Sequence, residues 1–318
     1  MYINSFGHYL PKDRVPNEYF YHVNGLSDGW IYERTGIKTR TRASLNENTN
    51  TMAVEAVSNA ADFIPYDIKD IDLIIGATYS PFDTVATLAH YVQRKFSIER
   101  ARVVSVSSAC SSFINAVEIV EGYFAAGKAK KAVIVASEHN SAYSNEKDTN
   151  SGHLWGDGAA CVFISKDRLS ENDWKIIDVY SQGLGHIGHS IEAVFLHPAN
   201  GGLLMPDGKD VFIYACNYMI KALDIICEKN NISAKDLDYI IPHQANIRII
   251  NNIKKNLGID ESKLFNNIEE LGNTGCASTV IALSQNRQKV KPGNIIGFTV
   301  FGGGYSCGSM IIQKLGLF

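Results

Sequence analysis

The strongest constraint on how this chain can fold is a repeat inside it. The segments DIKDIDLIIGATYS (67–80) and SAKDLDYIIPHQAN (233–246) both carry an acidic turn that runs into a short apolar stretch. Asp72 and Asp238 stand at matching places in the two segments, 166 residues apart. A match of this kind predicts that the chain contains two similar structural units.

A second match at the same offset supports the repeat. Cys110 in SSACSSF and Cys276 in NTGCAST are also 166 residues apart. GKAKKAVIVAS (127–137) recurs more loosely as VKPGNIIGFTV (290–300). Each half is therefore expected to run strand, small-residue turn, helix, basic turn containing glycine, strand.

Apolar runs alternate with helical patterns along both halves. DLIIGA, AVIVAS and YIIPH are continuous apolar runs, which are typical of strands buried on both faces. Between such runs the spacing of apolar residues predicts helices over 51–63, 112–126 and 212–229. Strands that alternate with helices imply parallel sheets covered on both sides, so we expect an α/β fold.

The length of 318 residues suits one large domain or two of about 160 residues each. The polar, turn-rich segment KDRLSENDW places the boundary near 168–175, which divides the chain into halves at 1–170 and 171–318. With 45% hydrophobic and 20% charged residues, the composition is ordinary for a globular protein. A net charge of −3 argues against broad nucleic-acid binding, which needs a basic surface.

The expected location is the cytoplasm. The first residues, MYINSFGHYLPKDRVP, lack the features of a secretory signal, and no apolar run approaches the roughly 18 residues of a membrane-spanning helix. The cysteines lie far apart without a CxxC pair, which favours reduced thiols. They are Cys110, Cys161, Cys216, Cys227, Cys276 and Cys307.

Cys110 stands between a predicted strand and a predicted helix, among the small residues of SVSSACSSF. A helix N-terminus offers free N–H groups and a positive dipole end, so we expect it to favour the reactive thiolate. Many cysteines are simply small buried apolar residues, and this turn alone leaves both interpretations open.

His243 follows directly after the apolar strand predicted in IIPHQAN. Ligand sites of parallel sheets lie at the C-terminal edge of the strands, which is where this side chain is expected. A histidine that only caps a strand end is the common alternative. The polar neighbours Gln244 and Asn246 favour a site.

Two more turns complete the candidate site. The repeat places Asn273, in LGNTGCAST, in the turn equivalent to that of Cys110, so the two turns are expected to face each other. Asn-Thr-Gly is also an ordinary turn and helix cap. Three consecutive glycines in FGGGYSCGS (301–309) suit a backbone whose N–H groups approach a substrate closely, as in an oxyanion hole.

Taken together, these motifs resemble the β-ketoacyl-acyl-carrier-protein synthase III family of the thiolase superfamily. The resemblance rests on Cys110 in SSACSSF, His243 in PHQANIRI, Asn273 in GNTGCAS, and the glycine run. DGWIYERTGIKTRTRA (28–43) and WGDGAA (155–160) match two more signatures in the same order. The resemblance covers essentially the whole chain and implies a five-layered αβαβα fold of two duplicated halves, usually as a homodimer.

The resemblance also implies a reaction and its residues. Cys110 takes an acyl group from coenzyme A as a thioester, and malonyl on acyl carrier protein loses carbon dioxide and attacks it. His243 and Asn273 then donate hydrogen bonds to the developing enolate, and the N–H groups of Cys110 and Gly303 form the oxyanion hole. No metal and no redox cofactor is implied, because coenzyme A arrives as part of the substrate.

Further residues match the substrate-binding positions of the family. Trp30 offers a stacking face for adenine, and Arg34 suits phosphate. Arg248, Lys254 and Lys255 could form a basic patch for the acidic carrier protein, although the two lysines could equally be a solvated helix face. The full set implied to contact the substrate is Trp30, Arg34, Asn246 and Arg248.

The sequence departs from the family pattern in three places. Family members often carry an arginine before the Gly-Asp-Gly motif, where this chain has Thr149 and Asn150, so a carrier-bound acyl group is an alternative donor. The nucleophile turn is more polar than usual. Val85 and Ala86 are smaller than the residues common in the segment expected to approach the acyl pocket, which would allow a longer chain.

Several other functions remain open. A specialised relative could serve secondary lipid, pigment or polyketide synthesis, or transfer acyl groups without condensation. A non-catalytic carrier-binding subunit would be expected to lose the nucleophile, and a cysteine hydrolase would cleave thioesters. A degradative thiolase is disfavoured because Phe301, not cysteine, precedes the glycines, and an elongating synthase because Asn273 replaces a second histidine.

Two features are not assigned a role. His186 and His189 in GLGHIGHS have a spacing that could ligate a metal, but no carboxylate or thiol cluster accompanies them in the sequence, so a glycine-rich loop is expected. Cys276 is expected to pack in the core.

Overall fold

The computed structural model describes residues 1–316. The strands in chain order are β1 (Tyr2–Tyr9), β2 (Asp13–Pro16), β3 (Thr39–Arg42), β4 (Leu73–Ala77), β5 (Arg102–Val106), β6 (Lys131–Glu138), β7 (Gly158–Ser165), β8 (Trp174–Gly183), β9 (Phe195–His197), β10 (Gly202–Leu204), β11 (Tyr239–Pro242), β12 (Ile295–Gly302) and β13 (Ser306–Lys314).

The α-helices are α1 (Asn17–Asn24), α2 (Asp28–Thr35), α3 (Thr49–Ala61), α4 (Leu88–Lys95), α5 (Ser112–Ala125), α6 (Ser190–Ala193), α7 (Gly208–Lys229), α8 (Ile247–Leu257), α9 (Ile268–Leu271) and α10 (Ser278–Asn286). The short 3₁₀ helices are η1 (Ile68–Asp70), η2 (Asn140–Ala142), η3 (Ala234–Asp236), η4 (Glu261–Lys263), η5 (Gly275–Ala277) and η6 (Arg287–Lys289). The three predicted helices correspond to α3, α5 and α7.

Nine strands form one sheet in the order β11-β12-β13-β8-β1-β7-β6-β4-β5. Only two residue pairs, Tyr2 with Lys175 and Ile3 with Trp174, join β1 to β8. On one side of this junction lie β1, β7, β6, β4 and β5, and on the other lie β8, β13, β12 and β11, while β2 with β3 and β9 with β10 form two separate small sheets. The exact division at residues 170 and 171 stays a prediction.

The expectation of purely parallel sheets was wrong. β4 is parallel to both β5 and β6, and β11 is parallel to β12, but β6–β7, β1–β7, β12–β13 and β8–β13 are antiparallel. Only three residues separate β12 from β13, which leaves no room for the crossover that a parallel pair requires. The sheet is therefore mixed, with its parallel strands next to the nucleophile turn and His243.

The repeated aspartates make the same contacts in both halves. The Asp72 carboxylate accepts hydrogen bonds from the Lys130 and Lys131 N–H groups at the start of β6. The Asp238 carboxylate accepts one from the Ile295 N–H at the start of β12, at 2.7 Å. Each aspartate thus fixes the parallel strand beside its own, which is a physical reason for the repeated motif.

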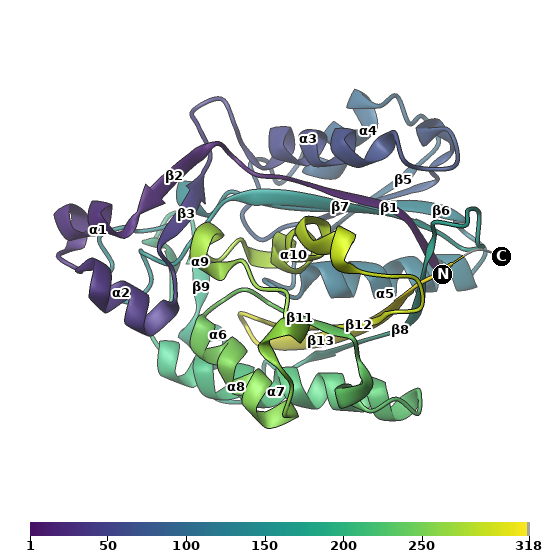
Figure 1. Cartoon of the computed structure of the whole chain (residues 1–318). Helices are drawn as coiled ribbons and strands as arrows, with labels where there is room; N and C mark the ends of the chain where they lie inside the picture. Colours follow the sequence, from purple (N-terminus) through teal and green to yellow (C-terminus); the bar gives the residue numbers. More distant parts are fainter. Residues whose placement is uncertain (317–318) are drawn as a thin grey trace.

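The helices and the two parts of the sheet stack in five layers (Figure 1). α3 packs on β1, β6 and β7 at the outside of one part, and α7 packs on β12 and β13 at the outside of the other. α5 and α10 lie between the two parts. α5 contacts β8 and β13 of the far part, and α10 contacts β1 and β7 of the far part. The five-layered α/β fold implied by the resemblance is confirmed.

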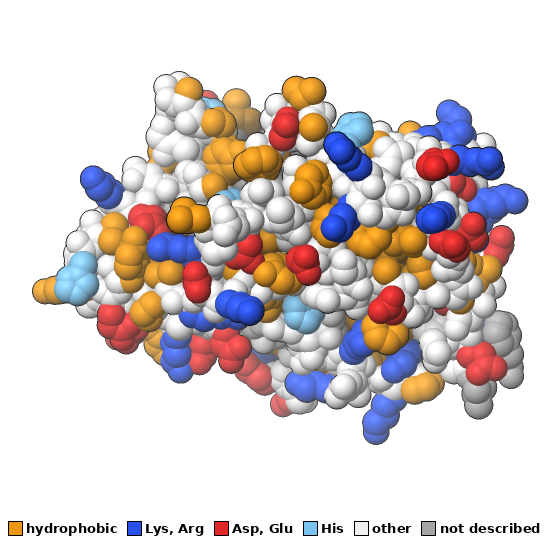
Figure 2. All heavy atoms as spheres, turned by 90° about the horizontal axis from the view of Figure 1, so that it is seen from above, with side chains coloured by type: hydrophobic (Ala, Val, Ile, Leu, Met, Phe, Trp, Pro, Cys, Tyr) orange, Lys and Arg blue, Asp and Glu red, His pale blue; other side chains and the backbone are white. Residues whose placement is uncertain are grey.

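The outer face over α3 and α4 shows acidic and basic side chains intermixed, with hydrophobic side chains gathered between them (Figure 2). No helix within residues 1–316 is long and apolar enough to span a bilayer. The apolar core is deepest around α5 and α10, so the two turns that begin these helices rest on rigid structure.

Candidate active site

The nucleophile turn joins β5 to α5 and is held by its own serines. The Ser108 N–H donates to Ser112 Oγ at 2.8 Å, Ser111 Oγ donates to the Ser108 carbonyl at 2.7 Å, and Ser112 Oγ donates to the Ala109 carbonyl at 2.6 Å. Ala109 has a φ of 49°, a strained value for a residue with a side chain. The unusually polar sequence of this turn therefore fixes the backbone around Cys110.

The glycine turn between β12 and β13 packs directly on the nucleophile turn. A Cβ at Gly302 would lie 2.6 Å from the Ser108 carbonyl oxygen and 3.1 Å from the Cys110 nitrogen. Ser306 Oγ lies 2.5 Å from Ser111 Oγ, which ties the two turns together. Glycine is required at 302 because no side chain fits between these backbones.

Gly302→Ala is expected to push the two turns apart, because the added Cβ would meet backbone atoms that cannot rotate away. We expect acyl transfer to Cys110 to fall by about 100-fold, the usual effect of a misplaced catalytic group. Rates of acyl-enzyme formation measure this loss. Gly183→Ala is the matched control, since Gly183 pairs with Ser306 and has open space around its Cα. Equal rates for both variants would contradict the prediction.

Cys110 lines a cavity of about 350 Å³ between the two halves. The cavity takes its polar wall from the nucleophile turn and the glycine turn, and its apolar wall from the segment before α7. Its lining residues are Tyr79, Ser107, Ser108, Ala109, Cys110, Trp155, Val194, Phe195, Leu196, Leu203, Gly303 and Gly304. Cys110 and Gly303, both predicted for the site, are thus brought together.

The expectation that the helix N-terminus favours the Cys110 thiolate is not met. α5 begins two residues later, at Ser112. The pKa of the Cys110 thiol is raised to about 12, chiefly by burial and then by the Glu138 carboxylate, while the Tyr79 hydroxyl acts to lower it. Loss of hydration therefore disfavours the thiolate, which depends on other groups around it.

His243 ends β11 with its ring buried. Ser278 Oγ lies 2.8 Å from His243 Nδ1 and also accepts a long hydrogen bond from the Gln244 N–H. When the Ser278 hydroxyl donates to Nδ1, the imidazole proton is on Nε2. Burial lowers the pKa of His243 to about 4, so the ring is neutral at physiological pH and presents Nε2–H as a donor.

Asn273 lies in the turn that precedes η5. Its Oδ1 accepts from the Gly275 N–H at 3.0 Å, so only the Nδ2 end of the amide can donate to a ligand. Its carbonyl accepts from the Gly156 N–H and from Asn140 Nδ2. The WGDGAA motif thus forms a strap that holds the Asn273 turn, and Trp155 of the strap lines the Cys110 cavity.

The two pseudo-equivalent turns meet, as the repeat predicts. A Cβ at Gly275 would lie 2.7 Å from Tyr79 Oη and 2.7 Å from Glu138 Cγ. Tyr79 in turn lines the cavity with Cys110. His243 and Asn273 do not line that cavity themselves. Asn273 is joined to the cavity through the Trp155 strap, whereas the His243 ring is paired with Ser278.

A second cavity, of about 650 Å³, contains all four residues predicted to contact the substrate: Trp30, Arg34, Asn246 and Arg248. Leu154 lines this cavity and its neighbour Trp155 lines the first, so the two cavities lie back to back. Asn150 also lines it, in the loop that lacks the family arginine. We refer to this second cavity as the entrance cavity and to the cavity around Cys110 as the reaction cavity.

The basic residues at and near the entrance cavity differ in the contacts that they already make within the protein. The Arg34 guanidinium stacks on the Trp30 ring at 4.3 Å, so both present one combined surface. Arg248 is exposed and donates to the Glu33 carbonyl at 3.1 Å. Lys254 is ion-paired with Glu261, and the basic patch of Arg248, Lys254 and Lys255 stays a prediction.

The segment predicted to approach the acyl pocket lines a separate cavity of about 180 Å³ beside the nucleophile turn, through Asp83, Thr84 and Thr87. Val85 does not reach it, since its side chain is 84% exposed, and Ala86 is exposed as well. The inference of a longer acyl pocket from these two residues is therefore not supported within one chain.

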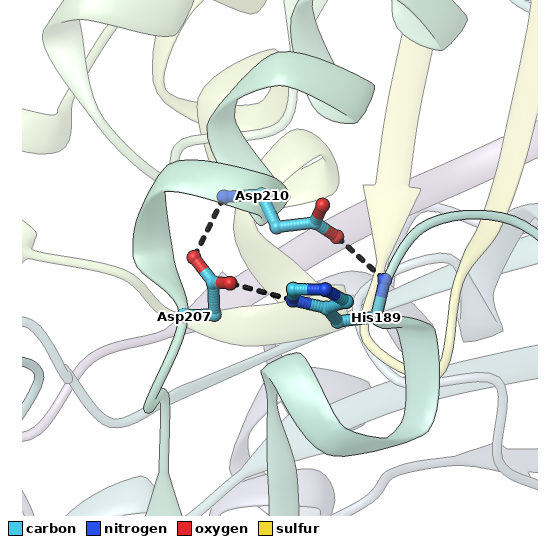
Figure 3. Close-up of side chains that lie close together, drawn as sticks. All are labelled: His189, Asp207 and Asp210. Carbon is cyan, nitrogen blue, oxygen red and sulfur yellow. Dashed lines mark hydrogen bonds and ion pairs between the residues drawn. The ribbon is translucent and has the colours of Figure 1, made fainter.

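His189 has the carboxylate neighbours that the sequence analysis did not find. Its Nδ1 lies 2.7 Å from Asp207 Oδ2, and its N–H donates to Asp210 Oδ2 at 2.9 Å (Figure 3). Tyr305 Oη donates to the same Asp210 oxygen at 2.6 Å. Asp207 and Asp210 stand at the start of α7, and Tyr305 belongs to the glycine turn. The hydrogen bonds therefore tie the glycine turn to the start of that helix.

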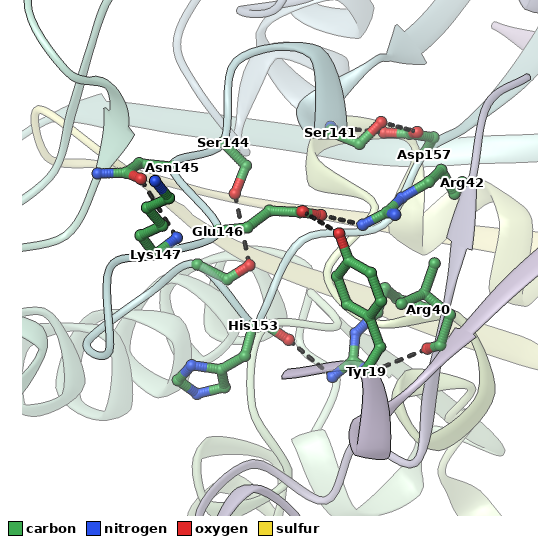
Figure 4. A network of polar contacts seen from close by, with 12 residues as sticks. Tyr19, Arg40, Arg42, Ser141, Ser144, Asn145, Glu146, Lys147, His153 and Asp157 are labelled. Atoms are coloured by element: carbon green, nitrogen blue, oxygen red, sulfur yellow. Dashed lines mark hydrogen bonds and ion pairs between the residues drawn. The ribbon is translucent and has the colours of Figure 1, made fainter. Parts of the chain in front are cut away.

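The loop from β6 to the WGDGAA strap is held by a polar network (Figure 4). Arg42 is ion-paired with Glu146, and Tyr19 Oη donates to Glu146 Oε2 at 2.6 Å. The buried Arg40 donates to the His153 carbonyl at 2.7 Å. This network fixes the wall that separates the two cavities.

His153→Gln is expected to reduce the loss of stability in acid. Burial lowers the pKa of His153 to about 4, and the charge of Arg40 lowers it further. The folded state therefore binds fewer protons than the unfolded state, whose histidine titrates near 6.5, so the free energy of unfolding falls as pH falls. Between pH 7.5 and 5 this site costs about 2 kcal/mol.

Urea unfolding of the wild type and His153→Gln at several pH values measures this contribution. Glu138 acts in the opposite direction, because burial raises its pKa to about 7 and the folded state gains stability as the pH falls through that value. Both proteins contain Glu138, so only the difference between them reports on His153. The prediction would be contradicted if the free energy of unfolding changed with pH equally in the wild type and in His153→Gln.

Tyr79, Glu138 and Ser278 were not predicted from the sequence. Tyr79 lies two residues after the end of β4, but the 166-residue offset pairs it with Ala245 and pairs His243 with Ala77, so the repeat gave no signal for it. Ser278 is the first residue of α10, where a serine reads as an ordinary helix start. Glu138 ends an apolar strand and gave no signal either.

The comparisons with known proteins agree with this geometry. The family model of 3-oxoacyl-[acyl-carrier-protein] synthase III matches residues 104–185, and the model of the C-terminal part of that family matches residues 227–314. A β-ketoacyl-[acyl-carrier-protein] synthase III from Clostridium perfringens is 36% identical over 320 residues, which cover 97% of this chain and 98% of that protein. The chain belongs to the synthase III family.

Solved structures of the synthase III family share the fold throughout. The enzyme from Aquifex aeolicus superposes with a TM-score of 0.91 at 32% identity, covering 98% of this chain and 99% of that one. The priming β-ketosynthase of the R1128 polyketide pathway gives a TM-score of 0.88 at 26% identity, covering 99% and 96%. Members of the synthase III family are acyltransferases of the condensing class, and this chain is one of them.

Proposed function

We propose that this protein starts acyl chains by a two-step condensation on Cys110. The observation that carries the proposal is a cavity lined by the nucleophile turn, the glycine turn and Tyr79, with the Asn273 turn packed against that tyrosine through Gly275. Fatty-acid synthesis is the process that this chemistry initiates in the synthase III family. The chemistry requires no metal or redox cofactor, since coenzyme A enters as part of a substrate.

In the first step the Cys110 sulfur attacks the carbonyl carbon of an acyl thioester. A new carbon–sulfur bond forms, the bond to the donor's sulfur breaks, and the donor leaves as a thiol with the proton that Cys110 gives up. In this proposal the backbone N–H groups of Cys110 and Gly303 hold the oxyanion formed in between. Both residues line the same cavity, which supports this role.

In the second step malonyl on a carrier protein loses carbon dioxide. The electrons of the broken carbon–carbon bond form an enolate, whose oxygen accepts hydrogen bonds from His243 Nε2–H and Asn273 Nδ2–H. The enolate carbon attacks the Cys110 thioester, and the cysteine sulfur leaves as a thiolate. A neutral His243 suits this step, because it donates a hydrogen bond without protonating the enolate.

Product analysis tests this proposal. The wild-type protein is incubated with an acyl-CoA or acyl-carrier-protein panel, and its mass is followed before and after malonyl-carrier protein is added. We expect an acyl adduct first and a 3-oxoacyl-carrier protein after the addition. A folded protein that gains no adduct from any donor would overturn the mechanism, and rapid thioester hydrolysis without a carbon–carbon bond would identify a hydrolase.

Coenzyme A is the acyl donor that the entrance cavity supports best. The combined surface of Trp30 and Arg34 offers a stacking face and a cation in this cavity, whose lining residue Leu154 is the chain neighbour of Trp155 in the Cys110 cavity. Asn150 provides no charge for phosphate where family members often have arginine. The rate at which acyl-CoA acylates Cys110 is therefore compared with the rate for acyl-carrier protein. Faster acylation by acyl-carrier protein would identify the carrier protein as the donor instead.

Arg248→Glu is expected to raise the KM for malonyl-carrier protein about tenfold, because it places an anion where an acidic partner would dock. The acyl-transfer step from a small acyl thioester without coenzyme A should change much less. Lys254→Glu is the matched comparison, since Lys254 already shares its charge with Glu261. Steady-state kinetics with carrier protein as the varied substrate measure both. Equal effects of the two variants would argue against a docking role for Arg248.

A specialised pathway is the second candidate. It is favoured by one observation, the 26% identity over nearly the whole chain to the priming ketosynthase of a polyketide pathway. The acyl donor that labels Cys110 fastest distinguishes fatty-acid initiation from a specialised pathway. Short-chain labelling supports fatty-acid initiation, while a preference for long or unusual chains supports the specialised role.

We also propose that the protein forms a homodimer. β5 is the edge strand of the sheet, so one side of its backbone is unpaired and open to a second strand. Exposed apolar side chains of Phe82, Val85 and Tyr91 lie in the segment before α4 and in α4 itself, which packs on β5. Light scattering at several concentrations tests this.

Six free cysteines suit the reducing cytoplasm as the location of the protein.

A further inference from the structure

Tyr79 has a buried hydroxyl group whose role the reaction described above leaves unexplained. The residue follows β4 and lines the same cavity as Cys110. Its Oη is shielded from solvent and makes no well-formed hydrogen bond to another atom of the described residues. A buried hydroxyl without a partner is rare in folded proteins and calls for a functional explanation.

The surroundings of this hydroxyl leave few partners. Glu138 is occupied, because its Oε2 accepts from Ser80 Oγ at 2.5 Å and from Thr78 Oγ1 at 3.0 Å, and its Oε1 faces the Cys276 N–H. Cys276 Sγ contacts the Ala77 carbonyl. Two acceptors therefore remain near Tyr79 Oη: the sulfur of Cys110 and Oδ1 of Asn140, which is also unpaired.

The absence of a side chain at Gly275 makes room for the phenol. A Cβ there would lie 2.7 Å from Tyr79 Oη and 2.9 Å from its ring, and Gly275 has a φ of 57°, which favours glycine. The Asn273 turn therefore packs against the tyrosine, which lines the same cavity as the Cys110 turn. The phenol thus contacts one turn of the site and shares a cavity with the other.

We propose that the Tyr79 hydroxyl donates a hydrogen bond to the sulfur of Cys110 and stabilises its deprotonated form, which makes Tyr79 a further catalytic residue. The inference rests on the proposed function in that it takes Cys110 as the nucleophile. A hydrogen bond to an anion is stronger than one between neutral groups, so the bond favours the thiolate over the thiol. It compensates in part for the burial that disfavours the thiolate.

Three titratable groups face the phenol: Cys110 from the nucleophile turn, Glu138 from β6 and Cys276 from η5. Burial raises the pKa of Tyr79 well above its usual value, and the negative charge that Cys110, Glu138 and Cys276 can carry raises it further. The tyrosine therefore keeps its proton throughout the neutral range and remains a donor. Its hydroxyl also lowers the pKa of the Cys110 thiol, in the direction that the inference requires.

The test is the rate at which iodoacetamide alkylates Cys110 between pH 6 and 9.5, read by peptide mass. Tyr79→Phe removes one oxygen without a partner, so we expect the variant to fold as stably as the wild type. The alkylation rate should rise with pH in both proteins, but the Tyr79→Phe curve should be displaced about one pH unit toward alkali. At pH 7.5 this is a loss of about tenfold in rate.

Tyr66→Phe is the matched control, since Tyr66 is a half-buried tyrosine that bonds Asn4 and does not line the Cys110 cavity. Its alkylation curve should coincide with that of the wild type. A Tyr79→Phe curve that also coincides would overturn the proposal and assign the hydroxyl to Asn140. If wild-type Cys110 neither alkylates nor accepts an acyl group, the proposed function fails instead, so the two failures are distinguishable.

Discussion

Replacing Cys110 with alanine is expected to abolish the acyl adduct and the condensation with it. No other described side chain combines a thiol with a place on the wall of the reaction cavity. Removal of the nucleophile from enzymes of this general kind lowers turnover by about 10⁴-fold or more. Intact mass after incubation with acyl donors, together with formation of the 3-oxoacyl product, measures both parts of the loss.

Cys276→Ala is the matched control for this experiment. Cys276 occupies the pseudo-equivalent turn of the second half, but it is fully buried and burial raises the pKa of its thiol well above the usual range. The variant should therefore keep its adduct. An adduct that survives Cys110→Ala and disappears in Cys276→Ala would move the nucleophile to the other half and contradict the assignment.

Asn273→Ala and His243→Ala are expected to separate the two steps. Both side chains are assigned to the enolate, so condensation should fall by about 10²- to 10³-fold, the cost of removing one oxyanion donor. Acyl transfer to Cys110 should fall much less, and the acyl-enzyme should accumulate. Rapid-quench measurement of the adduct and of the 3-oxoacyl product gives the two rates independently.

Asn286→Ala is the matched control for Asn273→Ala. Asn286 ends α10, and its side chain donates to a carbonyl of the same helix. The variant should leave both steps unchanged. Equal loss of both steps in Asn273→Ala would instead indicate that the amide acts by shaping its own turn, because Asn273 Oδ1 accepts a hydrogen bond from the Gly275 N–H. The His243 ring is paired with Ser278 instead, so the two variants together distinguish the roles.

The sequence was informative where chemistry depends on backbone position. Cys110, His243 and Asn273 each follow a strand of the repeat or its turn, and such places can be inferred from apolar runs and turn residues. Strand direction was not predictable from the same runs. β6 and β7 are both continuous apolar strands, and a buried antiparallel strand has the same pattern as a parallel one.

Properties that depend on three-dimensional surroundings could not be predicted. The raised pKa of Cys110 follows from burial and from Glu138, which is 28 positions away in the sequence. The carboxylates beside His189 come from the start of α7, after two intervening strands. In both cases the effect arises from elements that only packing brings together.

The position of β1 has a consequence for how the chain is made. β1 is the first strand to be synthesised, yet it lies in the middle of the sheet, between β7 and β8. The helix that covers its inner face, α10, is among the last elements to leave the ribosome. The first half therefore emerges with an apolar sheet face uncovered until most of the polypeptide has been translated. Such long-range closure slows folding, and it makes the growing chain a natural client for chaperones that bind exposed strands.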